Sequence, residues 1–102
     1  MPIYQTATYQ VNPEAVARVK QAIEEFVRYV KANEPGTQFY VAWQQKGDPT
    51  RFIHLFIFKD EAAQTIHSRS DAVKRFESVY SPELVGGEVN FIDFDLVATN
   101  QR

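Results

Sequence analysis

Two histidines, His54 and His67, are the groups in this sequence best suited to proton transfer near neutral pH. An imidazole titrates at about pH 6.5, so either ring can serve as a general base or as a hydrogen-bond donor to a bound molecule. Both also have structural explanations. His54 stands among phenylalanines as a hydrogen-bonded core residue, and His67 stands near a predicted helix C-terminus, where positive charge is favourable. The two lack the short spacing of a helical metal motif and no carboxylate joins them, so we predict no metal site.

Other familiar reactive groups are missing from the sequence. The chain has no cysteine, which excludes a cysteine nucleophile, a disulfide framework and a thiolate metal site. Gly86-Gly87 is too sparse a glycine run for a phosphate-binding loop, and no Gly-x-Ser-x-Gly nucleophile motif is present.

His54 lies in the strand that organises the chain, residues 51–58. Side chains alternate between the two faces of a strand. One face therefore carries Phe52, His54, Phe56 and Phe58, and the other carries Ile53, Leu55 and Ile57. Neither face is polar, so this strand should be covered on both sides.

The surrounding pattern predicts alternating strands and helices. Asn12 and Pro13 favour a helix start with Asn12 as its cap, and Ser68 and Asp71 have capping-box spacing for another. The predicted order is strand 3–11, helix 13–33, strand 37–45, strand 51–58, a short helix over 61–67, a second helix that starts within 68–71 and runs to residue 80, and strand 88–97.

This order predicts an α+β fold of the ferredoxin-like, split βαβ kind with a four-stranded antiparallel sheet. We expect a single domain over residues 1–102, with 98–102 as a frayed tail. Two helices on one sheet face leave the second apolar face of the central strand uncovered. A second copy of the sheet would cover it, which predicts a homodimer.

Composition narrows the class of protein. With 44% hydrophobic and 24% charged residues, the chain of 102 residues is typical of a globular domain. A net charge of −2 argues against nucleic-acid binding, which needs clustered Lys and Arg. No apolar run reaches about 18 residues, so we predict no membrane span. The N-terminus lacks the basic and apolar regions of a signal peptide, so we expect a cytoplasmic protein.

Three stretches carry a resemblance to a known family. They are Glu34-Pro35-Gly36 before the second strand, Phe58-Lys59-Asp60-Glu61-Ala62 leading to His67, and Ser70 with Ala72, Val73 and Phe76 after it. In these residues, and in element order over nearly the whole chain, the sequence resembles the antibiotic biosynthesis monooxygenase (ABM) domain family.

The resemblance implies a dimeric α+β barrel. Several members oxygenate quinols or polyketide aromatics without metal or flavin, a branch degrades haem, and others have no known activity. This sequence departs from the pattern, because Phe58 stands where many members carry Trp and Phe56 where many carry Glu. Both changes make the pocket side more apolar. Without that Trp, and with no Asn in residues 3–11, we predict no haem degradation.

The resulting hypothesis is a cofactor-independent monooxygenase acting on a quinol or another hydroxylated aromatic. A deprotonated phenol can pass an electron to dioxygen directly, so the protein must supply a base, an oxyanion donor and a water-poor pocket. We assign His67 as base or donor. The predicted substrate-binding residues are His54, Trp43, Phe52, Phe56 and Phe58. The alternative is a non-catalytic dimer of the same fold that binds a small apolar ligand or only itself.

Chain geometry predicts how the histidines meet. From Phe58 back to His54 is about 13 Å of strand, and from Asp60 to His67 roughly 10 Å of helix running back along the sheet. The two rings should therefore lie at nearly the same level. If the phenylalanine face lies under the helices, both point into one gap. If the Ile53 face does, His54 points into the dimer interface.

Overall fold

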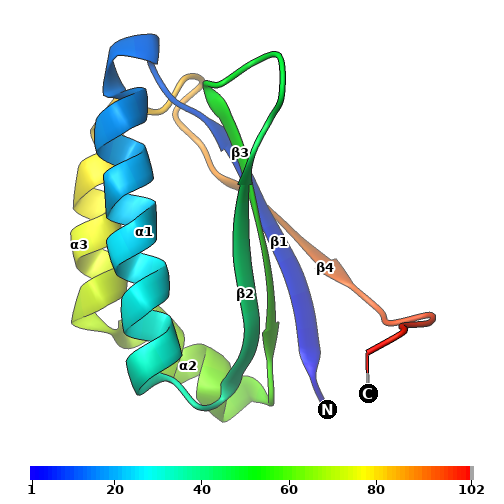
Figure 1. Ribbon diagram of the computed structural model, residues 1–102. Coiled ribbons are helices and arrows are strands. Elements are labelled where there is room, and N and C mark those ends of the chain that lie inside the picture. Colours follow the sequence, from blue (N-terminus) through cyan, green and yellow to red (C-terminus); the bar gives the residue numbers. More distant parts are fainter. Residues whose placement is uncertain (102) are drawn as a thin grey trace.

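A computed structural model describes residues 1–101 as a sheet with its helices on one face (Figure 1). The sheet has four antiparallel strands in the order β2-β3-β1-β4, which confirms the predicted ferredoxin-like arrangement. The elements are β1 (Ile3–Gln10), η1 (Pro13–Ala15), α1 (Val16–Asn33), β2 (Thr37–Gln44), β3 (Arg51–Phe58), α2 (Glu61–Arg69), α3 (Asp71–Tyr80), η2 (Ser81–Glu83) and β4 (Asn90–Phe94). None of the helices in residues 1–101 is both long and apolar enough to cross a bilayer.

Strand β3 pairs with β2 on one side and β1 on the other, so it lies inside the sheet. Its burial alternates along the strand, with Phe52, His54, Phe56 and Phe58 buried. The phenylalanine face therefore lies under the helices. The residues directly opposite His54 are Ala7 on β1 and Ala42 on β2, and both are small. Their size leaves room for larger side chains at the diagonal positions, which are Tyr9 and Tyr40.

Helix α1 packs on this face through a stripe of buried apolar residues, Val19, Ile23, Phe26 and Val30. The predicted side-chain cap by Asn12 is wrong. A short 3₁₀ turn over Pro13–Ala15 precedes α1, and Asn12 donates through Nδ2 to Glu83 Oε1 at 3.2 Å. Asn12 therefore ties the helix start to η2 instead of capping it.

The chain breaks between α2 and α3 at Ser70, whose backbone is extended. Its hydroxyl oxygen accepts from Val73 N at 3.1 Å, so Ser70 caps α3 and the predicted role of Ser68 is wrong. Asp60 caps α2 in the same way, accepting from Ala63 N at 2.9 Å. These two caps fix where α2 begins and ends and therefore where its side chains point.

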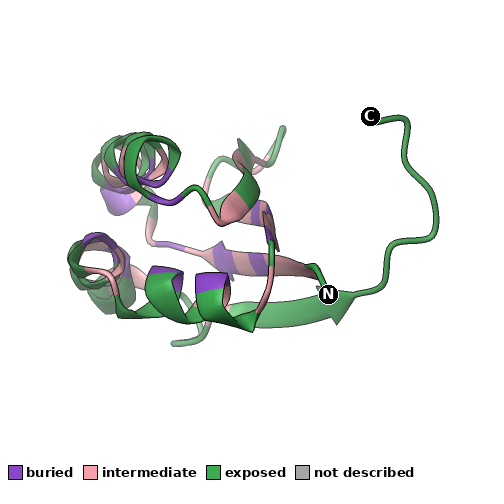
Figure 2. Ribbon diagram, turned by 90° about the horizontal axis from the view of Figure 1, so that it is seen from below, coloured by how far each residue is buried: buried purple, intermediate pink, exposed green. Residues whose placement is uncertain are grey.

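Burial alternates from residue to residue along β3 (Figure 2), as expected of side chains that point to opposite faces of the sheet. Buried residues lie between helices and sheet, while on the other face of β3 Ile53, Leu55 and Ile57 are only half-buried. All five residues of β4 are exposed. This strand is shorter than predicted, and residues 95–101 form no helix or strand. Arg102, the end of the predicted tail, lies outside the described residues.

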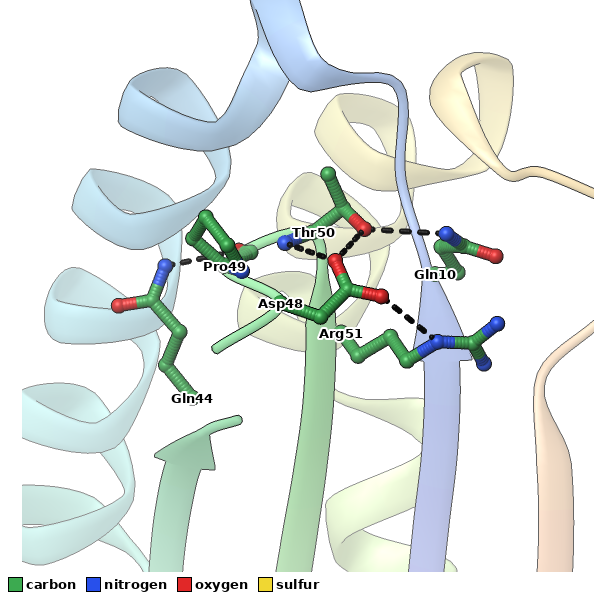
Figure 3. A network of polar contacts seen from close by, with 6 residues as sticks. All are labelled: Gln10, Gln44, Asp48, Pro49, Thr50 and Arg51. Carbon is green, nitrogen blue, oxygen red and sulfur yellow. Dashed lines mark hydrogen bonds and ion pairs between the residues drawn. The ribbon is translucent and has the colours of Figure 1, made fainter. Parts of the chain in front are cut away.

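The β2–β3 turn is held by Asp48 (Figure 3). Its Oδ1 accepts from Thr50 Oγ1 at 2.6 Å and from Thr50 N at 3.2 Å, and its Oδ2 accepts from Arg51 Nε at 3.0 Å. Gln10 at the end of β1 donates to Thr50 Oγ1 at 3.0 Å. The turn thereby links β2 and β3 to the end of β1, which helps to fix the register around His54.

Gly36 gives the first testable prediction, because it lies where α2 touches the start of β2. A Cβ at Gly36 would stand 2.6 Å from Ala63 Cβ on α2. We expect Gly36→Ala to push α2 away and to lower the free energy of unfolding by about 1–3 kcal/mol in urea titrations. The double variant Gly36→Ala/Ala63→Gly should be more stable than the sum of the two single changes allows. Strict additivity would contradict the contact.

Candidate functional site

One cavity of about 240 Å³ lies between the sheet and helices α2 and α3. His54 and His67 both line it, so the two rings share one gap, as strand and helix geometry predicted for this face. The lining residues are mostly aromatic or apolar: Gln5, Ala7, Tyr9, Phe26, Tyr40, His54, Phe56, Phe58, His67, Ser68, Val73, Phe76, Glu77, Tyr80, Val89 and Phe91. Ser68, Glu77 and Phe91 are exposed, which places the mouth of the cavity among α2, α3 and β4.

Two of the predicted substrate-binding residues do not reach this cavity. Trp43 is 57% exposed and pairs with Ile53, so it stands on the outer face of the sheet. The alternation of β2 explains this, because Tyr40 and Ala42 take the inner positions. Phe52 is buried but does not line the cavity. Its ring stacks on that of Tyr9, which does, with 5.6 Å between the ring centroids.

His67 is held by a buried carboxylate. Its Nδ1 lies 2.7 Å from Glu34 Oε1, and both side chains are almost fully buried. Thr37 Oγ1 donates to the same oxygen at 2.9 Å. With the carboxylate as acceptor, Nδ1 of His67 carries a proton and Nε2 is left as a basic lone pair. Within residues 1–101, His67 makes its only side-chain hydrogen bond through Nδ1, and the one buried side-chain oxygen or nitrogen without a partner is Oε2 of Glu34. His67 therefore has the form of an oriented base beside the cavity.

The residue next to His67 faces away from the sheet. Ile66 is 62% exposed, although its spacing from Ala63 would allow it to share the inward face of the helix. The inward face of α2 is instead Ala63 and His67, which are the two buried residues of that helix.

His54 lies between two tyrosine hydroxyls. Tyr9 Oη is 2.7 Å from its Nε2, and Tyr40 Oη is 2.6 Å from its Nδ1. The ring is 1% exposed, and burial lowers the pKa of His54 to about 4. Burial also raises the pKa of both the Tyr9 and Tyr40 hydroxyls. All three groups are therefore neutral at pH 7, so His54 supplies hydrogen bonds and does not act as a base.

Three of these groups are not among the site residues predicted from the sequence. Glu34 belongs to a stretch that carries the family resemblance, and its carboxylate before Pro35-Gly36 stands at a helix end that faces α2. Tyr9 falls in a predicted strand, and Tyr40 is one of the strand aromatics expected in the core or along the pocket. The signal that would have found them is the strand register, since they are the diagonal neighbours of His54.

Fold and cavity together define a ferredoxin-like α+β protein with a mostly apolar, two-histidine cavity against its sheet. The family described as antibiotic biosynthesis monooxygenase matches residues 2–78, and the chain belongs to this family. No curated protein matches the sequence.

Solved structures agree with this assignment. A protein from Bacteroides thetaiotaomicron, provisionally named an antibiotic biosynthesis monooxygenase, superposes with a TM-score of 0.90 at 19% identity, over 99% of this chain and 94% of its own. One from Caulobacter crescentus with the same provisional name gives 0.85 at 25% identity, covering 95% and 91%. A conserved protein from Methanosarcina mazei gives 0.81 at 26% identity, covering 92% and 91%.

The low pKa of His54 predicts a pH dependence of stability. The folded state keeps the ring neutral down to about pH 4, whereas the unfolded chain binds the proton near pH 6.5. Stability from this group is thus complete above about pH 6.5 and is lost as the pH falls toward 4, by roughly 3 kcal/mol. Urea titrations from pH 7 to 4 measure it. His54→Gln has no titrating ring, so its free energy of unfolding should fall by roughly 3 kcal/mol less than that of wild type over this range. An identical pH dependence in the two proteins would contradict the low pKa of His54.

Proposed function

We propose that the protein is a cofactor-independent monooxygenase that oxidises a quinol or a similar hydroxylated aromatic. The observation that carries this proposal is the Glu34–His67 pair, 2.7 Å apart, with Nε2 of His67 left over beside an aromatic cavity. Membership of the monooxygenase family supports the reaction class.

The chemistry needs one base and dioxygen. His67 Nε2 accepts the proton of a quinol hydroxyl, and the phenolate passes one electron to dioxygen. Superoxide and the aryl radical combine at a ring carbon to give a peroxide anion. His67 returns the proton to it, and the resulting hydroperoxide loses water to leave a hydroxyquinone. One quinol and one dioxygen thus give one hydroxyquinone and one water, and the quinol itself supplies the electrons. Glu34 positions the imidazole and stabilises its protonated form.

The walls of the cavity suit this substrate. Phe56 and Phe58 line one side and Phe76 another, which offers apolar surfaces to a flat ring. A flat ring bound against these walls would displace water from around the phenolate and superoxide.

We further propose that the protein acts as a homodimer joined through the outer face of the sheet. Ile53, Leu55 and Ile57 are half-buried there, and Phe39 and Trp43 are exposed beside them. An apolar area of this extent is unusual on a free surface and suits a second copy of the same face.

The rival function is binding without catalysis. The apolar side chains of Phe56 and Phe58, at positions where many family members carry Glu and Trp, favour it, because they leave the His67 side as the main source of acid–base chemistry. The experiment that tests catalysis separates the two.

That experiment is oxygen uptake with 1,4-dihydroxynaphthalene, corrected for autoxidation and with the hydroxyquinone measured by chromatography. We expect His67→Ala to lower kcat by a factor of about 10² to 10⁴. Ile66→Ala, a matched change at an exposed site on the same helix, should leave it unchanged. Protein that binds the quinol under argon but shows no enzymatic uptake across a panel of naphthoquinols and anthrones would favour the rival.

The dimer has its own test. Leu55→Asp places a charge on the outer face of β3, so sedimentation at micromolar concentration should show wild type as a dimer and the variant as a monomer. Lys59→Asp, an exposed residue just past the strand, serves as the control. A well-folded wild-type monomer would refute the proposal.

A further inference from the structure

The group around His54 has more hydrogens than it uses. A neutral imidazole has one N–H and one acceptor nitrogen, and each tyrosine hydroxyl has one hydrogen. Tyr9 and Tyr40 each bond one ring nitrogen, so three hydrogens serve two bonds. One tyrosine must accept from the ring N–H, and its own hydroxyl hydrogen is then left over.

That spare hydrogen has no hydrogen-bond acceptor among the residues that the structure describes. Within residues 1–101, the hydroxyl oxygens of Tyr9 and Tyr40 make no hydrogen bond other than the one to His54. Both tyrosines line the cavity. A bound molecule in the cavity is therefore the natural acceptor, since a buried donor without a partner is costly.

The position of His67 favours Tyr40 as the residue with the spare hydrogen. The ring of Tyr40 lies 5.8 Å from that of His67 and stacks on Phe56 at 5.1 Å. Tyr9 instead packs against Phe52 and Tyr80, on the side of the cavity away from α2. A substrate oxygen that gives its proton to His67 would thus lie within the reach of Tyr40 rather than Tyr9.

We propose that Tyr40 donates a hydrogen bond to the substrate oxygen that becomes anionic, and that His54 and Tyr9 hold it in the donating orientation. Tyr9 donates to Nε2 of His54, the Nδ1–H donates to Tyr40, and the Tyr40 hydroxyl hydrogen points into the cavity. Tyr40 is then a second catalytic residue, and His54 and Tyr9 are positioning residues. This inference rests on the proposed function for its substrate, a phenolate formed by His67.

The two histidine sides of the cavity supply different hydrogen-bonding groups. His67 supplies an acceptor and Tyr40 a donor. High pKa values at both tyrosines, caused by burial, keep the donor from losing its own proton. Hydrogen bonds to charged oxygen are stronger than those to neutral oxygen, so the contact grows as the phenolate forms.

Binding of 4-nitro-1-naphthol tests the proposal without any oxygen chemistry, because its anion is coloured. We expect Tyr40→Phe to raise the Kd of the naphtholate by about ten- to a hundredfold. The Kd of 1-nitronaphthalene, which has no hydroxyl, should stay the same. Tyr29→Phe, the same change on α1 outside the cavity, should alter neither. Equal weakening of both ligands by Tyr40→Phe, or of neither, would overturn the role of Tyr40.

A second substitution keeps the test sharp if Tyr40→Phe disturbs folding. Replacing Tyr40 by 3-fluorotyrosine retains the hydroxyl and makes it a stronger donor, so naphtholate binding should tighten severalfold. The same replacement at Tyr29 should change nothing. Weaker or unchanged binding with fluorotyrosine at position 40 would count against the donor.

The positioning role has a spectroscopic readout. Long-range ¹H–¹⁵N spectra should show His54 as the Nδ1–H tautomer in wild type and a mixture of tautomers in Tyr9→Phe. A wild-type Nε2–H tautomer would give the spare hydrogen to Tyr9 and refute the assignment.

The outcomes also separate this inference from the proposed function. Naphtholate binding that depends on Tyr40, in a protein without quinol oxidation, would defeat the function and keep the donor. Quinol oxidation with naphtholate binding unchanged in Tyr40→Phe would keep the proposed function and refute the donor role of Tyr40.

Discussion

The structure depends on burying a polar ring in the middle of an apolar sheet face. His54 is 1% exposed, and its neighbours on the same face of β3 are phenylalanines. A ring with two nitrogens in such a place needs two hydrogen-bond partners. The small residues Ala7 and Ala42 directly beside it make space, and the tyrosines at the diagonals fill part of that space and supply the hydroxyls. The unfilled remainder belongs to the cavity.

The opposite wall depends on how closely α2 approaches the sheet. Gly36 allows Ala63 to sit against the start of β2, and Lys59 N donates to Gly36 O at 2.8 Å just before the helix begins. This close approach brings His67 to Glu34 at the end of α1. The register of the strands and the close approach of α2 thus place two histidines with different hydrogen bonding across one cavity. One ring is bonded at both nitrogens and the other at only one.

The sequence was sufficient to predict the fold but not the hydrogen bonds between the site residues. Alternation in β3 and helical spacing in α1 and α3 are local patterns, and they predict the element order and, with the crossover rules, the ferredoxin-like fold. They do not decide which face of β3 lies under the helices, and the two histidines share a gap only if the phenylalanine face does. Trp43 was misplaced because aromatic content does not say which face of β2 turns inward. The Glu34–His67 contact and the Tyr9–His54–Tyr40 bonds join residues distant in the chain. Their pairing is set by strand register and by the approach of α2, which no local pattern records.

We propose above all that a hydroxylated aromatic binds between the two histidines, under the helices. Titration of ¹⁵N-labelled protein with 1,4-dihydroxynaphthalene under argon tests it most directly, because no turnover intervenes. We expect the largest chemical-shift changes at cavity residues, with intermolecular contacts from the ligand to Phe56, His67 and Phe76. Changes centred on Trp43, Ile53 and Leu55, on the outer face of the sheet, would contradict it.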